Sequence, residues 1–158
     1  MASEKTGNKL KICLAASAGG HLSQLLKTKD AWEMHEIFFV TTADIVKEQL
    51  SQYGQVYVVG ECNRRQPFRV AKVLVKCTKV ALSKDFNVII STGAAVGCIM
   101  CYLCKMLGAK VIWIDSITNA ERLSLSGRLV RYISDLFLVQ WPQLAKHHRN
   151  TEFVGTLI

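Results

Sequence analysis

The chain has 158 residues, of which half are hydrophobic and a fifth are charged. This length allows one domain with its own hydrophobic core, and the composition excludes a disordered, collagen-like or low-complexity chain. Twenty Lys and Arg residues outweigh twelve Asp and Glu residues, which leaves a net charge of +8. This surplus favours an anionic partner such as a phosphate group, an acidic membrane surface or a nucleic acid.

Short apolar runs alternate with helical patterns along the whole chain. The runs lack period-two alternation, as expected of parallel strands buried on both faces, and they are Leu10–Ala16, Glu36–Thr42, Val56–Gly60, Val88–Ser91, Lys110–Asp115 and Asp135–Gln140. The helices expected between them are His21–Met34, Asp44–Tyr53, Pro67–Ser83, Ala94–Leu107 and Arg122–Ile133, and Pro142 suits the first turn of a further short helix. This order predicts one doubly wound, Rossmann-like α/β domain with a parallel sheet over residues 10–158, after a loose polar lead over residues 1–9.

Two apolar stretches imitate membrane-targeting signals. The segment around Cys13 ends in a pattern like a signal-peptide cleavage site, but it is short and Lys11 interrupts it, so we expect a first strand there. The longest uncharged stretch, Val88–Cys104, reaches the lower limit for a membrane span. A Ser-Thr-Gly sequence divides it, which indicates a strand, a turn and a helix, and no transmembrane anchor is expected.

Six cysteines are spread along the chain, most of them within apolar runs. A buried cysteine behaves as a small hydrophobic residue, and a chain of this size needs no disulfides, so we expect reduced thiols and a cytosolic setting. Cys98, Cys101 and Cys104 are spaced like ligands of an iron–sulfur cluster. They fall on an apolar helical segment with no obvious fourth ligand nearby, so we interpret them as core residues and predict no metal site.

The turn after the first strand carries the first candidate site. Ligands of doubly wound sheets bind outside the carboxyl ends of the strands, and here Ser17, Gly19 and Gly20 lead directly into a helix. Glycines let a ligand approach the backbone, and a helix start offers free N–H groups to a phosphate. His21 follows as a candidate base or hydrogen-bond donor. The turn lacks the G-x-G-x-x-G fingerprint of dinucleotide sites, and an anion site and a structural tight turn both remain consistent with it.

Two further turns follow strands at the same edge of the predicted sheet. Small and hydroxyl-bearing residues come after the fourth strand, at Ser91, Thr92 and Gly93, and they open a second helix. Two such helix starts at one edge strengthen the case for a phosphate-bearing ligand. After the fifth strand, Asp115 is placed either for polar contact or proton transfer with a ligand, or for bonding to loop amides beside a serine that caps the next helix.

The third predicted helix has a basic face. Arg and Lys recur there at spacings of four, three, four and three, at Arg65, Arg69, Lys72, Lys76 and Lys79. A basic amphipathic helix is typical of proteins that bind an anionic membrane surface, and a merely solvated helix face is the alternative. No recognised nucleic-acid-binding motif accompanies the stripe, so no nucleic-acid partner is expected.

The sequence resembles a known family over nearly its whole length. The matching stretches, in the family's order and spacing, are ICLAASAGGHLSQLL, FFVTT, Asn63-Arg64, VIISTGAAVG, CYLCKMLGAKVIWIDS, LSLSGRLV and DLFLVQWPQL. They resemble the acceptor-side subunit of the split UDP-N-acetylglucosamine transferase that extends dolichol-linked oligosaccharide. The likeness is closer still to the bacterial counterparts of this subunit in capsule and exopolysaccharide synthesis.

This resemblance implies the N-terminal, acceptor-binding half of a GT-B glycosyltransferase, peripheral on the cytoplasmic face of a membrane. A separate protein would carry the nucleotide-sugar domain, so the UDP-sugar is expected on that partner, this chain would hold no cofactor, and it would be inactive alone. The acceptor would be a sugar linked to a polyprenyl diphosphate, and the transferred sugar N-acetylglucosamine. The residues assigned to the acceptor and its phosphates are Ser17, Gly19, Gly20, Asn63, Arg64, Ser91, Thr92, Gly93, Asp115, Ser116 and Arg122, and His21 is expected to contact the phosphate or the reacting hydroxyl.

The sequence departs from the family pattern in two places. The usual Glu-Ser with an Arg three residues on is here Asp115-Ser116 with Asn119, and Arg122 lies one turn further along. The usual Gln-Trp-Glu is here Gln140-Trp141-Pro142, which weakens any claim that an acidic residue is required at that point.

Two other classes of function fit parts of the sequence. The chain could be a non-catalytic adaptor that recruits and stimulates a partner glycosyltransferase, or a free-standing nucleotide binder. The missing glycine fingerprint argues against the nucleotide binder, as do Thr41 and Thr42 at the end of the second strand, where a ribose contact needs an acidic residue. The resemblance to half of a GT-B enzyme implies that the partner surface involves the segment after Asp135, where such a domain joins its other half.

Overall fold

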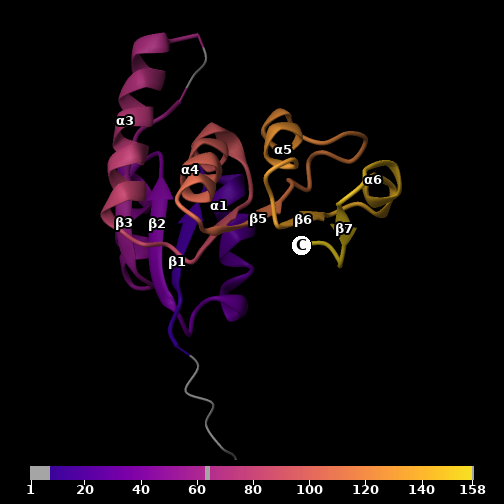
Figure 1. Cartoon of the computed structure of the whole chain (residues 1–158), viewed down its shortest axis with the longest axis horizontal. Helices are drawn as coiled ribbons and strands as arrows, with labels where there is room; N and C mark the ends of the chain where they lie inside the picture. Colours follow the sequence, from indigo (N-terminus) through magenta and orange to yellow (C-terminus); the bar gives the residue numbers. More distant parts are fainter. Residues whose placement is uncertain (1–7, 63–64, 158) are drawn as a thin grey trace, which may run out of the picture.

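The computed structural model describes residues 8–62 and 65–157, and Asn63 and Arg64 of the predicted acceptor site lie outside the described residues. Seven strands form one sheet in the order β3-β2-β1-β4-β5-β6-β7 (Figure 1). They are β1 (Lys11–Ala15), β2 (Glu36–Thr41), β3 (Gln55–Val58), β4 (Val88–Ser91), β5 (Lys110–Ile114), β6 (Leu136–Val139) and β7 (Glu152–Phe153). Every pairing is parallel, which confirms the doubly wound, Rossmann-like α/β fold.

The helices follow the predicted order. They are α1 (Gly20–Leu26), the 3-10 turns η1 (Lys29–Ala31) and η2 (Asp44–Val46), α2 (Lys47–Ser51), α3 (Pro67–Ser83), α4 (Ala94–Met106), α5 (Leu125–Val130) and α6 (Pro142–His147). Helix α3 has the predicted bounds, and the other four predicted helices are shorter. The first helix, predicted to reach Met34, ends at Leu26. Thr28 explains this, because its hydroxyl donates to the Leu25 carbonyl at 2.7 Å and accepts from the indole of buried Trp32 at 3.0 Å. These side-chain bonds compete with the continuing helix.

Two further boundaries differ from the expectation. The helix predicted from Arg122 starts at Leu125, because the Ser124 hydroxyl accepts from the Gly127 N–H at 2.8 Å and caps it. Strand β7 does not appear among the predicted strands. Its two residues, Glu152 and Phe153, are both exposed, so they carry no burial pattern that a sequence could reveal.

Two helix layers cover the two faces of the sheet. Alternate strand residues point to opposite faces, so Cys13 and Ala15 of β1 pack with residues of α3, α4, α5 and α6, whereas Ile12 and Leu14 pack with residues of α1 and α2. The sheet is therefore buried on both faces where the layers cover it, which is why its strands lack polar alternation.

The chain changes direction in the sheet between β1 and β4. From β1 it proceeds outward to β2 and β3 with α1 and α2 on one face, and from β4 it proceeds the other way through β5, β6 and β7, with α4 and α5 on the opposite face. β1 and β4 pair directly, with Ala15 beside Ser91 at their carboxyl ends. The connections that follow these two strands therefore diverge, and this is the point at which doubly wound sheets bind their ligands.

The cysteines of the C-x-x-C-x-x-C segment lie on α4, as predicted, with Cys101 and Cys104 fully buried. Burial raises the pKa of the Cys101 thiol well above its ordinary value and that of Cys77 to about 12, so these thiols stay protonated and pack as hydrophobic side chains. Within residues 8–62 and 65–157, no three His, Cys, Asp or Glu side chains are grouped so that they could hold a metal ion.

Helix α3 is the longest helix of the fold. Val73, in its second turn, packs next to Gly60 just after β3, and Figure 1 shows the first turns of α3 extending beyond the carboxyl ends of the neighbouring strands. In the described part of the chain, neither α3 nor any other helix has the length and apolar character needed to cross a membrane.

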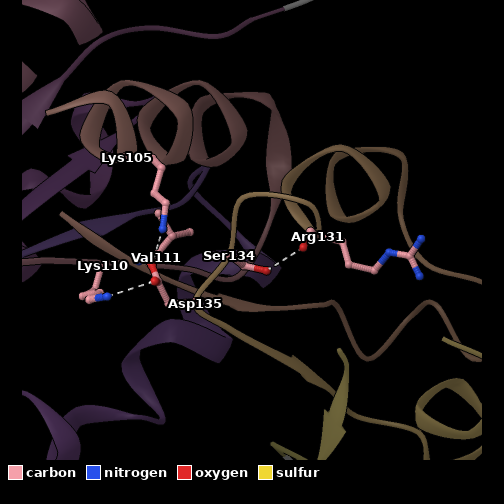
Figure 2. A network of polar contacts seen from close by, with 6 residues as sticks. All are labelled: Lys105, Lys110, Val111, Arg131, Ser134 and Asp135. Carbon is pink, nitrogen blue, oxygen red and sulfur yellow. Dashed lines mark hydrogen bonds and ion pairs between the residues drawn. The ribbon is translucent and has the colours of Figure 1, made fainter. Parts of the chain in front are cut away.

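An ionic network fastens the start of β6 to α4 and β5. Asp135 accepts from Lys105 at 2.7 Å, from the Val111 N–H at 2.9 Å and from Lys110 at 3.2 Å (Figure 2). The Lys105 ammonium is the largest cause that lowers the pKa of the Asp135 carboxyl to about 2, followed by the Val111 amide. The carboxylate form is therefore the one that the folded chain prefers.

Asp135→Asn is expected to lower the free energy of unfolding by about 1 kcal/mol at neutral pH, a value discounted because the carboxylate is partly exposed. A lowered pKa in the folded state stabilises above the unfolded pKa near 4, and this contribution is lost as the pH falls from about 4 towards 2. Urea unfolding of the wild type and of Asp135→Asn at pH 7, 4 and 3 measures the difference in free energy of unfolding. This difference should become smaller as the pH falls. Asp85→Asn, at an exposed position, is the control. A difference that does not change with pH would contradict this account.

Candidate functional site

His21 and Thr92 join the two diverging connections at the carboxyl ends of β1 and β4. The Nδ1 atom of His21 lies 2.9 Å from the Thr92 carbonyl oxygen, and the Thr92 hydroxyl donates to the His21 carbonyl at 2.5 Å. A carbonyl oxygen only accepts, so Nδ1 carries a proton in this contact. In the neutral ring the lone pair is then on Nε2, which makes Nε2 the atom that can accept a proton from a ligand.

The imidazole of His21 lies against Gly93, the residue that opens the α4 turn. A Cβ at position 93 would stand 2.5 Å from Nδ1 of His21 and closer still to Cε1, and the φ of Gly93 is +137°. Ala94 follows with a φ of +68°, which is unfavourable for a residue with a Cβ. Backbone strain of this kind clusters at functional sites and persists only where the surroundings hold it.

The connection after β1 presents open backbone. Gly19 and Gly20 are exposed, and a Cβ at either would meet no atom within 4 Å. The Ala18 N–H donates to the Thr42 hydroxyl at 3.1 Å, so the end of β2 holds this turn in place. The first turns of α1 and α4 contain no acidic residue, and no described side chain caps either helix. Their free N–H groups suit an anion better than a cation.

The hydroxyls predicted at the end of β4 bond within the protein. Ser91 is fully buried, and its Oγ accepts from the Gly93 N–H at 3.3 Å. Thr92 is equally buried, and its hydroxyl is used by the contact with His21. These residues shape the turn and position His21, and at this edge a ligand can reach the backbone of the turn more readily than their side chains.

Asp115 is the first residue of the connection between β5 and α5, and its carboxylate bonds groups within and next to this connection. It is 1% exposed, and its carboxylate accepts from the Trp113 indole at 3.1 Å, the Ser124 N–H at 2.9 Å and the Ser124 hydroxyl at 2.5 Å. This geometry favours the structural alternative, in which Asp115 binds loop groups beside the serine that caps α5. Both carboxylate oxygens are thus used within the protein.

The remaining predicted residues are not gathered at one point. Ser116 is buried, and its hydroxyl contacts Gln24 at 3.4 Å and Thr118 at 3.0 Å. Arg122 is exposed on the connection between β5 and α5, and Ser17 is half-buried beside the glycine turn. The structure thus brings His21, Thr92 and Gly93 into contact with one another, while Ser116 and Arg122 belong to the neighbouring β5 connection.

A pair of buried glutamines connects the strand ends, and the sequence motifs assign neither of them a role. Gln140, after β6, donates through Nε2 to Gln24 of α1 at 2.5 Å and to the Asp115 carbonyl at 3.0 Å, and its Oε1 accepts from the Leu157 N–H at 2.9 Å. Gln24 also accepts from the Ile117 N–H at 3.3 Å. A signal for Gln24 is present in the sequence, because it follows His21 by three residues and so lies on the same face of the predicted helix.

The basic residues of α3 are exposed, as the stripe requires. Arg69, Lys72, Lys76 and Lys79 lie on the outside of the helix, and Arg65 is exposed in the turn before it. The buried residues of α3, among them Val73, face the sheet. The stripe is therefore a solvent-facing surface of the protein.

Comparison with known proteins identifies the fold and the family. Residues 12–157 match the family model described as "Oligosaccharide biosynthesis protein Alg14 like". The chain is 33% identical over 175 aligned residues, 94% of its length and 81% of the relative, to the UDP-N-acetylglucosamine transferase subunit ALG14 of Yarrowia lipolytica. It is 40% identical over 60 residues to the subunit of the same name from Schizosaccharomyces pombe, which covers 37% of this chain and 29% of that one.

A solved structure agrees with the observed fold. MurG of Acinetobacter baumannii superposes with a TM-score of 0.73 at 13% identity, over 92% of this chain and 45% of MurG, so the chain spans less than half of that enzyme. The fold is thus similar to that of GT-B glycosyltransferases. The two relatives are fungal, and the closer likeness to bacterial subunits stays a prediction. With a family match that extends from β1 to the last described residue, the chain belongs to the Alg14-like family of oligosaccharide biosynthesis proteins.

Proposed function

We propose that the chain is a non-autonomous subunit of a split GT-B glycosyltransferase. It binds a polyprenyl-diphosphate-linked acceptor, and a nucleotide-sugar-binding partner supplies N-acetylglucosamine from its UDP derivative. The observation that carries the proposal is the alignment over 94% of the chain with a relative named as a UDP-N-acetylglucosamine transferase subunit. The donor is expected on the partner, and no cofactor is assigned to this chain.

The acceptor site of this proposal is the edge between β1 and β4. The open backbone at Gly19 and Gly20 and the uncapped start of α4 would bind the diphosphate. Nε2 of His21 would take the proton of the acceptor hydroxyl as its oxygen bonds to the anomeric carbon of the donor. The bond from that carbon to the UDP oxygen breaks, and UDP leaves with the electron pair. The Thr92 carbonyl supports this role because it accepts a hydrogen bond from the Nδ1–H group of the imidazolium that forms.

The basic stripe of α3 would hold the subunit against the anionic membrane that carries the acceptor. Each Lys or Arg near such a surface contributes about 1 kcal/mol to binding, and Arg65, Arg69, Lys72, Lys76 and Lys79 are all exposed.

The partner would dock at the segment after Asp135, as expected for two GT-B domains with the active site between them. The bond from the Leu157 N–H to Gln140 is consistent with this, because Gln140 follows β6 at the same end of the sheet as the proposed acceptor site.

A transferase assay with radiolabelled UDP-N-acetylglucosamine and a membrane-borne polyprenyl diphosphate acceptor tests the proposal. The chain is assayed alone, together with the nucleotide-sugar-binding protein that co-purifies with it, and that protein is assayed alone. We expect turnover in the mixture only. Full turnover by the partner alone would show that this chain is an adaptor that recruits or stimulates the enzyme. The proposed acceptor site between β1 and β4 would then be wrong.

A further inference from the structure

The outermost line of α3 alternates apolar and basic side chains. Val73 and Cys77 face the sheet, and on the opposite side of the helix the exposed residues in order are Phe68, Lys72, Val75, Lys79 and Leu82. The Phe68 side chain is 91% exposed, and Leu82 is 67% exposed. Exposed apolar side chains that recur along one helix face, in contrast to scattered single ones, indicate a surface that meets another apolar phase.

Helices α4 and α5 continue this apolar surface. On α4, Tyr102 and Met106 point away from the buried face, and Met106 is 82% exposed. Leu125 and Leu129 of α5 and Tyr132 in the turn after it follow at spacings of four and three residues, and all three are exposed, Tyr132 to 81%. The Tyr102 hydroxyl donates to the Leu129 carbonyl at 2.9 Å, which joins the two patches directly.

The charges of this helix layer have one sign. Helices α3, α4 and α5 together contain six basic residues and no Asp or Glu, namely Arg69, Lys72, Lys76, Lys79, Lys105 and Arg128. Lys105 is paired with Asp135 at the start of β6. On the other face of the sheet, the short helices carry acidic groups, at Asp30, Asp44 and Glu48. A layer that combines exposed apolar side chains with cations and lacks acidic groups complements the interface of an anionic bilayer.

We infer that the whole outer face of the α3–α4–α5 layer, and not the α3 stripe alone, is the surface that lies on an anionic phospholipid bilayer. The inference rests on the proposed function and adds α4 and α5 to its membrane contact. It also fixes the orientation of the subunit. The helix layer, about 10 Å thick, separates the sheet from the headgroups, so the edge that carries His21 opens sideways along the membrane surface, where the diphosphate of a lipid-linked acceptor is located.

Vesicle flotation with the full chain tests this inference. The α4–α5 variant Met106→Ser/Tyr132→Ser removes apolar contact, the α3 variant Lys72→Glu/Lys79→Glu reverses charge, and Met34→Ser/Ile45→Ser is the matched control, because Met34 and Ile45 are 75% and 88% exposed beside the helices of the opposite face. With phosphatidylcholine vesicles that contain phosphatidylserine, we expect the α4–α5 variant to partition about tenfold less than the wild type. The control should bind like the wild type, and vesicles without phosphatidylserine should bind all proteins weakly.

A second measurement remains informative if the double variant folds poorly. The emission that Tyr132→Trp adds to that of the three native tryptophans should be quenched by lipids with brominated acyl chains, and the emission that Ile45→Trp adds should not. Loss of binding in the α3 variant alone, with the α4–α5 variant unchanged and Tyr132→Trp unquenched, would overturn the inference and leave the proposed α3 contact standing. Absence of vesicle binding by the wild type would overturn both the inference and the proposed membrane contact of α3. If the α4–α5 variant instead weakens only the complex with the partner subunit, the face is a protein interface and the inference is wrong.

Discussion

Replacing His21 by asparagine is expected to lower turnover of the assembled transferase by about 10²–10⁴-fold, the range of general acid–base contributions. The asparagine amide can donate to the Thr92 carbonyl much as Nδ1 does now, while the position of Nε2 is lost. The variant should therefore fold, bind its partner and retain the acceptor, because the contact that joins the β1 and β4 connections survives. The effect should appear in kcat and not in KM.

The measurement is the pH dependence of kcat for the wild-type complex and for His21→Asn, with partner binding measured in parallel. A base at position 21 gives the wild type an acidic limb that the variant lacks. His35→Asn is the matched control, since His35 is half-buried and bonds the Leu10 N–H at the opposite end of the strands. Wild-type turnover by His21→Asn would remove the catalytic assignment and leave His21 as a link between the two connections.

Gly93→Ala is expected to reduce turnover by at least about 100-fold through displacement of the imidazole, a loss within the range of general-base contributions. The added Cβ would stand 2.5 Å from Nδ1 of His21, so the ring must leave its place over the turn. The positive φ of +137° adds backbone strain of about 1–3 kcal/mol for a residue with a Cβ. Both effects act on the free energy of unfolding, but only the displacement of His21 acts on the chemistry.

Gly108→Ala separates these two effects. Gly108 also has a positive φ, of +94°, but a Cβ there meets no atom within 4 Å. We expect this variant to lose stability in urea unfolding while the complex keeps its turnover. Equal losses of turnover in the two variants would indicate that Gly93→Ala acts through stability alone, and the account of His21 positioning would then be wrong.

The fold was predictable because buried parallel strands leave a plain trace in the sequence. Six of the seven strands coincide with apolar runs that lack polar alternation, and the helices follow in the expected order. The boundaries that differ depend on side chains that act over a few residues. Thr28 ends α1 by bonding the Leu25 carbonyl, and Trp32 strengthens that stop from within the core. Strand β7 has only two exposed residues and leaves no such trace.

The site was predictable as a set of turns, and not as a set of contacts. Parallel strands bring their carboxyl ends to one edge, so the order of strands and helices is enough to assign Gly20, His21 and Thr92 to the same edge of the sheet. The two bonds between His21 and Thr92 depend on the register of β1 against β4, which the sequence does not encode locally. The bond between Gln24 and Gln140 joins positions 116 residues apart, and the partners of Asp115 depend on where the chain places Ser124.

The pairing of β1 with β4 has a consequence for how the protein folds. β2, which comes next in the chain, can add to β1 early, whereas the Lys11 N–H reaches its partner Asn87 across 76 residues, and His21 reaches Thr92 across 71. Closing so long a loop lowers the conformational entropy of the chain before any contact offsets the loss. Such pairings therefore form late and slowly. During synthesis, the chain through β3 can assemble the α1–α2 layer while the imidazole still lacks its carbonyl partner. The contact between His21 and Thr92 therefore forms in a late step, together with the pairing of β1 and β4.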